Sequence, residues 1–249
     1  MHSWQKSCIS GIKKNRNIKM LTKVEINAII KQIIKGNKEF VNSHENNFFE
    51  EFQNHQSPFI TMVSCSDSRV QPNVILPEAT NKIFMVENIG NQILSSEGSV
   101  DYGIFHLKTP ILLILGHSDC GAIKAFMNGY SNERNSIKHE LQYLEKADLL
   151  VTDSAENKNV VNNVLKNIDY QVDVALSKYS DLISNNELTV IGAYNDFKND
   201  ISSELGDLIF VNINGETDSD KIKQMPIFEN ISNENKDKFI KRLACCEVL

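Results

Sequence analysis

The sequence predicts an α/β protein with a single domain, built on a four- to five-stranded, mainly parallel sheet that is flanked by helices. Two observations support this class. Short, continuous apolar runs recur over residues 59–63, 82–86, 111–115, 188–193 and 208–213. Segments with helical spacing separate them, over 97–108, 120–128, 136–149 and 157–180. Apolar runs of this length, alternating with helices, are typical of strands that are covered on both faces.

An N-terminal helical arm is expected before the first strand. Isoleucines recur at helical spacing between residues 23 and 42, and Thr22 is a suitable N-cap. Residues 1–19 carry five basic side chains and no acidic one, without the apolar centre of a secretory signal. We expect this segment to be a disordered basic extension ahead of a domain over 20–249. Organellar targeting and a translation start at Met20 are the alternatives.

Composition narrows the class of protein further. A chain of 249 residues with 41% hydrophobic side chains can bury one sizeable core. No apolar run approaches the roughly 18 residues that a membrane span needs, and the formal charge of −6 argues against nucleic-acid binding. The five cysteines do not suggest a disulfide framework, so a cytoplasmic protein with metal-binding or catalytic cysteines is expected. Cys245 and Cys246 are expected to be surface or dimer-contact thiols.

Two polar clusters follow predicted strands directly. Residues 64–69 follow the first strand, and residues 116–121 follow the third. Ligand sites in open α/β sheets form beyond the carboxyl ends of strands, so both clusters can face one crevice. His117 and Cys120 are three residues apart and can share a metal ion, and Cys65 supplies a third ligand if the strands are neighbours. Two thiolates and one imidazole suit Zn²⁺, and three protein ligands leave a position open for catalysis.

Asp67 and Arg69 alternate with Cys65, so an extended segment presents all three side chains on one face. The Asp67 carboxylate can accept a hydrogen bond from zinc-bound water or occupy the fourth metal position itself. Arg69 can pair with Asp67 and keep it ionised and oriented. An ordinary surface ion pair, which contributes little to stability, is the alternative for these two residues.

Together the clusters resemble a known family. Cys65-Ser66-Asp67-Ser68-Arg69 is similar to the Cys-x-Asp-x-Arg signature of β-class carbonic anhydrases, and His117-x-x-Cys120-Gly121 is similar to their second signature. The resemblance implies reversible hydration of CO₂ to bicarbonate by hydroxide bound to one Zn²⁺ per chain. It implies that Cys65, His117 and Cys120 are the ligands, that Asp67 orients the hydroxide or closes the site as a fourth ligand, and that Arg69 holds Asp67. It also implies self-association as a dimer or tetramer.

A further likeness concerns the subgroup. Gln56-Ser57-Pro58 precedes Cys65 by nine residues, as in plant-type members, which implies that Gln56 enters the pocket and binds substrate. The backbone N–H of Gly121 would lie near the substrate oxygen. Two positions depart from members with an inhibitory bicarbonate site, because Glu87 stands in place of an Arg and Met62 in place of a Trp. We therefore expect that site to be absent.

Two alternatives to carbonic anhydrase activity remain open. The first is an enzyme of the same fold and metal site that hydrolyses carbonyl sulfide or carbon disulfide. The second is a non-catalytic protein whose zinc only supports folding or assembly. Asp67, Arg69 and Gln56 argue against the second, because a structural metal site needs no such residues around it.

Overall fold

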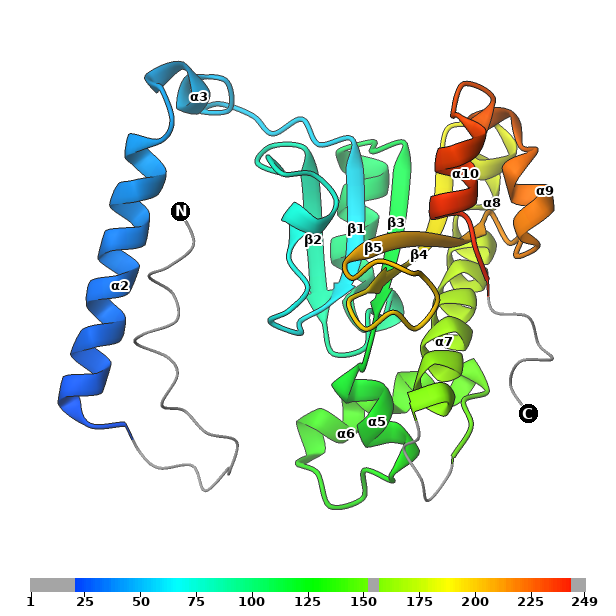
Figure 1. Ribbon diagram of the computed structural model, residues 1–249, viewed down its shortest axis with the longest axis horizontal. Coiled ribbons are helices and arrows are strands. Elements are labelled where there is room, and N and C mark those ends of the chain that lie inside the picture. Colours follow the sequence, from blue (N-terminus) through cyan, green and yellow to red (C-terminus); the bar gives the residue numbers. More distant parts are fainter. Residues whose placement is uncertain (1–20, 152–156, 243–249) are drawn as a thin grey trace. The chain divides into compact units, whose positions relative to one another are not determined.

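A computed structural model describes residues 21–151 and 157–242, and the chain forms two compact units, residues 1–55 and 56–249 (Figure 1). The predicted basic extension 1–19, Met20, Cys245 and Cys246 lie outside the described residues. The N-terminal unit contains helix α2 (Lys23–Asn42) and the short helix α3 (Asn46–Glu50). The C-terminal unit contains the sheet and both polar clusters.

Helix α2 begins where the sequence predicts. The Thr22 hydroxyl accepts the backbone N–H of Glu25 at 3.2 Å, and a Glu25 carboxylate oxygen accepts the backbone N–H of Thr22 at 2.8 Å. This reciprocal capping box satisfies two of the backbone donors that every helix start leaves free. Within the N-terminal unit no residue of α2 is buried, so the isoleucine stripe at Ile26, Ile29, Ile30, Ile33 and Ile34 is exposed.

The sheet has five strands, as predicted: β1 (Ile60–Cys65), β2 (Ile83–Asn88), β3 (Ile111–His117), β4 (Thr189–Asp196) and β5 (Asp207–Ile213). Their order is β2-β1-β3-β4-β5. The first four are parallel, and β5 pairs antiparallel with β4. Because β1, β3 and β4 are parallel neighbours, their carboxyl ends lie at one edge of the sheet, and the two polar clusters meet there.

Helices connect and cover these strands: α4 (Glu97–Asp101), α5 (Gly121–Met127), α6 (Asn135–Gln142), α7 (Asn157–Lys178), α8 (Ser180–Ser184), α9 (Ser219–Lys223) and α10 (Asn233–Phe239). A π-helical turn, Tyr102–His106, extends α4, and 3₁₀ turns span Pro72–Val74, Leu94–Ser96, Tyr143–Ala147 and Pro226–Phe228. The helix expected over 136–149 is therefore α-helical only to Gln142. The polar stretch 215–236 contains α9 and the start of α10, and the side chains of Asp218 and Ser232 cap these two helices.

Helix α7 packs closely on the centre of the sheet. A Cβ atom added at Gly116 in β3 would lie 2.7 Å from Ile168 and 2.8 Å from Val164, both in α7. A Cβ atom at Gly192 in β4 would lie 2.6 Å from Ile168. These glycines let the helix approach the strands. The backbone just before His117 is thereby fixed against the core.

The opposite face of the sheet buries a smaller apolar cluster that includes Met62, Leu113, Leu115 and Ala193. The strands are thus covered on both faces, which explains their continuous apolar sequences. Throughout residues 21–151 and 157–242, every helix is too short or too polar to span a bilayer.

Candidate metal centre

Three potential metal ligands meet at the carboxyl ends of β1 and β3. Cys65 is the last residue of β1, His117 is the last of β3, and Cys120 immediately precedes α5. Their ligand atoms all lie within 4.8 Å of one another, and all three residues are buried. The structure thus brings together the three residues that the sequence predicts.

His117 is oriented for metal binding. Its Nδ1 lies 2.9 Å from the backbone carbonyl oxygen of Ser118, so Nδ1 carries the proton and donates. Its Nε2 is buried without a hydrogen-bond partner among the described residues. Burying an unpaired ring nitrogen costs free energy unless something binds it. A metal ion beside the two sulfurs would use this lone pair, and a carbonyl on the other nitrogen is the usual support of a ligating histidine.

Backbone N–H groups point at both sulfurs. The N–H of Gly90 donates to Cys65, and the N–H groups of Ala122 and Ile123, in the first turn of α5, donate to Cys120. The pKa of Cys65 is lowered to about 4, and the largest cause is a hydrogen bond from the Cys120 thiol. The same hydrogen bond, together with burial, raises the pKa of Cys120.

A proton held between the two sulfurs thus favours the thiolate form of Cys65. A divalent cation in place of that proton would offset the charge of two thiolates, and two thiolates with one neutral imidazole form a donor set that Zn²⁺ favours. The residues present thus fit a zinc ion. Sequence reasoning missed Gly90, which has a φ of +90° in the turn after β2. The Asn88 side chain holds this turn by bonds to the backbone N–H and carbonyl of Gln92, both at 2.7 Å.

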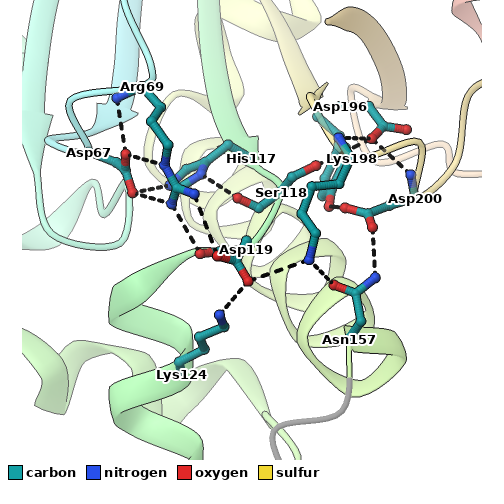
Figure 2. A network of polar contacts seen from close by, with 11 residues as sticks. Asp67, Arg69, His117, Ser118, Asp119, Lys124, Asn157, Asp196, Lys198 and Asp200 are labelled. Atoms are coloured by element: carbon teal, nitrogen blue, oxygen red, sulfur yellow. Dashed lines mark hydrogen bonds and ion pairs between the residues drawn. The ribbon is translucent and has the colours of Figure 1, made fainter. Parts of the chain in front are cut away.

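Asp67 and Arg69 form a bidentate pair near His117, one of the three predicted ligands (Figure 2). Arg69 donates from Nε to Asp67 Oδ1 at 2.8 Å and from Nη2 to Oδ2 at 2.7 Å, and its backbone N–H reaches Oδ1 at 3.0 Å. These bonds lower the pKa of Asp67 to about 2, so the carboxylate is ionised at neutral pH. Asp67 Oδ2 lies 4.0 Å from His117 Nε2, on the side where a metal would bind.

A second carboxylate, Asp119, contacts the other side of Arg69 (Figure 2). Arg69 Nη2 donates to the Asp119 carbonyl at 3.2 Å, and Nη1 lies 3.5 Å from Asp119 Oδ2. Asp119 also pairs with Lys124 and lies 3.6 Å from Lys198. Burial alone would raise the pKa of Asp119, but the two lysines and Arg69 lower it. Sequence reasoning did not select Asp119, although it lies between two predicted ligands.

Residues at the carboxyl end of β4 also contact the candidate metal centre. Sequence reasoning missed these residues too. The buried Asp196 carboxylate accepts the Ser118 hydroxyl at 3.2 Å and four backbone N–H groups of residues 198–202. Ser118 in turn holds His117. Phe197 packs against the His117 ring at 5.8 Å between centroids. The rule that sites form beyond strand ends applies equally to β4, but its polar residues follow no recognisable metal-ligand pattern.

The remaining predicted residues lie outside the three-ligand cluster. Gln56 is exposed, four residues before β1. Gly121 is exposed at the first position of α5, and a Cβ atom placed there would contact nothing within 4 Å. Met62 is fully buried within β1 and Glu87 is exposed on β2. The roles of Gln56 and Gly121, and the absence of a bicarbonate site, stay predictions.

Comparisons with known proteins agree with this geometry. A family model described as carbonic anhydrase matches residues 60–201. The chain is 30% identical over 137 residues to a carbonic anhydrase of Synechococcus elongatus, and 39% identical over 83 residues to one of Helicobacter pylori. The first match covers 50% of both chains, and the second covers 30% of this chain and 38% of the relative. The chain thus spans half or less of these relatives' length.

Solved structures show the same fold. The β-carbonic anhydrase CcaA is 22% identical, with a TM-score of 0.64 over 75% of this chain and 87% of that one. One of two tetrameric β-carbonic anhydrases from Sordaria macrospora, also 22% identical, has a TM-score of 0.58 over 68% of this chain and 92% of that one. At this level of identity the likeness concerns the arrangement of helices and strands.

Proposed function

The chain belongs to the β-class carbonic anhydrase family, and we propose that it catalyses the reversible hydration of CO₂ to bicarbonate at one Zn²⁺ ion. One observation carries this proposal. Cys65, His117 and Cys120 place their ligand atoms within 4.8 Å of one another, in a buried position beside an ionised carboxylate. Three ligands from the chain leave room for a fourth, which is the arrangement of catalytic zinc sites. When bound there, Zn²⁺ would supply a Lewis acid that makes water nucleophilic near neutral pH.

The chain's own groups prepare the ligands. The Ser118 carbonyl fixes the tautomer and ring orientation of His117, so that Nε2 is free to bind. The N–H groups of Gly90, Ala122 and Ile123 stabilise negative charge on the two sulfurs. These donors are backbone groups of a tight turn and a helix start, so they stay in place when the metal binds.

Asp67 acts as the hydrogen-bond acceptor for the water that attacks CO₂. Its carboxylate is ionised at neutral pH and cannot donate, so an O–H group facing it must point its proton toward Asp67. The oxygen lone pair is then directed away from Asp67, toward the substrate. Because Arg69 engages both carboxylate oxygens, we propose this role for Asp67 in preference to that of a fourth metal ligand. Arg69 is the group that holds Asp67 in position.

Gln56 and Gly121 complete the proposal as substrate-binding groups. The open space at Gly121 leaves its backbone N–H accessible to a substrate oxygen. The exposed Gln56 would reach a pocket in a dimer or tetramer, and the tetrameric Sordaria macrospora structures support such an assembly. Sedimentation of the purified protein tests the assembly, and a fully active monomer would contradict the role of Gln56. A cytoplasmic location, expected from the cysteine content, also belongs to the proposal.

The decisive experiment measures zinc content and CO₂ hydration on the same samples, with Asp67→Asn as the test variant. Wild type should contain one zinc per chain and hydrate CO₂. Asp67→Asn should keep most of the zinc and lose much of the rate, because an amide can turn its NH₂ toward the attacking oxygen. Wild-type protein with full zinc and no hydration at pH 8.5 would favour a structural zinc protein.

The same preparation distinguishes the other alternative. Carbonyl sulfide and carbon disulfide are supplied in place of CO₂, and hydrogen sulfide release is measured. Release from either gas at rates above those of CO₂ hydration would replace the proposed reaction with hydrolysis of a CO₂ analogue.

A further inference from the structure

Phe197 follows β4 directly and contacts both His117 and Arg69 at the candidate metal centre. Its ring lies 5.8 Å from the His117 ring, centroid to centroid, with 28° between the planes. On Arg69, the Cζ atom lies 4.8 Å from the centroid of the Phe197 ring. One aromatic side chain thus touches a predicted metal ligand from β3 and the arginine that follows β1.

The contact with Arg69 completes a set of constraints on the guanidinium. Asp67 accepts hydrogen bonds along one edge of its plane, and Asp119 accepts along another. The N–H donors of a guanidinium lie in its plane, so such bonds restrain motion within the plane more than tilting out of it. An aromatic face within about 6 Å attracts a guanidinium electrostatically and limits that motion. The Arg69 side chain is nearly half exposed, so without the ring its free face would meet solvent.

The backbone at Phe197 is itself held firmly. Asp196, directly before it, accepts the backbone N–H groups of Lys198, Asp200, Ile201 and Ser202 at 2.8–3.2 Å. Lys198, directly after it, donates to Asn157 at 2.7 Å (Figure 2). Phe197 is therefore carried by a loop that is anchored on both sides, as a support for another side chain requires.

We propose that Phe197 is a positioning residue, whose ring holds the Arg69 guanidinium in the orientation in which it grips Asp67. This inference rests on the proposed function, because it assigns Phe197 a role in orienting the Asp67 acceptor. Zinc binding does not depend on Phe197, since the Ser118 carbonyl already orients His117.

A double-mutant cycle tests the proposal. Phe197→Leu removes the aromatic face and keeps apolar volume, and it should lower kcat/KM about 3- to 10-fold, the range expected for a partly exposed cation–π contact. Phe197→Tyr keeps the face and should stay within about twofold of wild type. In an Arg69→Ala background, Phe197→Leu should change kcat/KM by less than about twofold, because the group it acts through is gone. Phe210→Leu, in β5, is the matched control and should leave kcat/KM unchanged.

Two readouts do not use CO₂ hydration. Zinc content should stay at one per chain in Phe197→Leu, and hydrogen exchange of the Arg69 Nε–H, followed by NMR, should become faster. If zinc-loaded wild type hydrates no CO₂, the proposed function fails, while unchanged exchange in Phe197→Leu overturns the positioning role separately. An equal loss of kcat/KM with and without Arg69 also overturns it. Phe197→Met serves the same tests if the leucine variant does not fold.

Discussion

Replacing Asp196 with Asn should destabilise the protein through the loop that carries Phe197. In the wild type, Oδ1 accepts the backbone N–H groups of Lys198 and Asp200, and Oδ2 accepts those of Ile201 and Ser202. The carboxylate is buried. An amide has only one oxygen. Whichever way it turns, two backbone N–H groups face its NH₂ and lose their acceptor.

The expected loss of stability follows from these two backbone N–H groups that have no acceptor. A buried donor left without a partner costs about 1–3 kcal/mol, so two cost about 2–6 kcal/mol. Water can reach residues 203–206, which are exposed, and so we expect the lower part of that range, about 2–4 kcal/mol. For a chain of this size each kcal/mol lowers Tm by about 2–4 °C, which gives a fall of roughly 5–15 °C.

The effect should depend on pH. Burial alone would raise the pKa of Asp196, but the backbone N–H groups hold it below its ordinary value. The unfolded chain therefore takes up the proton first, near pH 4, and the stabilisation is present above that pH and is lost as the pH falls further. The variant has no such carboxylate. The difference in Tm between wild type and Asp196→Asn should accordingly be smaller at pH 3 than at pH 7.

Thermal unfolding followed by circular dichroism measures both effects. Asp148→Asn is the matched control, because the Asp148 side chain is fully exposed and Asn tolerates its φ of +48°. The control should change the free energy of unfolding by less than about 0.5 kcal/mol. A fall in Tm for Asp196→Asn no larger than that of the control would refute the reasoning.

Three further predictions concern the metal centre and its supports. Cys120→Ala should lose zinc and CO₂ hydration together, measured as metal content and rate, and retained activity would remove Cys120 from the ligand set. Gly116→Ala should lower the free energy of unfolding by about 1–3 kcal/mol, because the added Cβ atom would lie 2.7 Å from Ile168. An unchanged midpoint in denaturant titrations would contradict this packing. Asn88→Ala should weaken zinc binding about 10-fold, because the substitution removes the side chain that holds the turn carrying the Gly90 N–H. Chelator competition measures the affinity, and an unchanged value would show that the turn needs no such support.

Much of the fold was predictable because its signals are local. The five strands and helix α7 follow from apolar runs and helical spacing, which report the faces that a segment buries. The capping box at Thr22 and Glu25 lies within four residues. Helices α9 and α10 escaped prediction because they are short and polar, with only the capping residues Asp218 and Ser232 as signals.

The sequence by itself determined the ligand types and their pairing with strand ends: Cys65 after one apolar run, and His117 with Cys120 after another. It could not show that β1 and β3 are neighbours, which is what brings the three ligand atoms within 4.8 Å. It also left out the supports at Gly90 and Phe197, which come from the ends of β2 and β4. The physical reason is that these contacts join segments far apart in the chain, and only the order of strands in the folded sheet decides which of them meet.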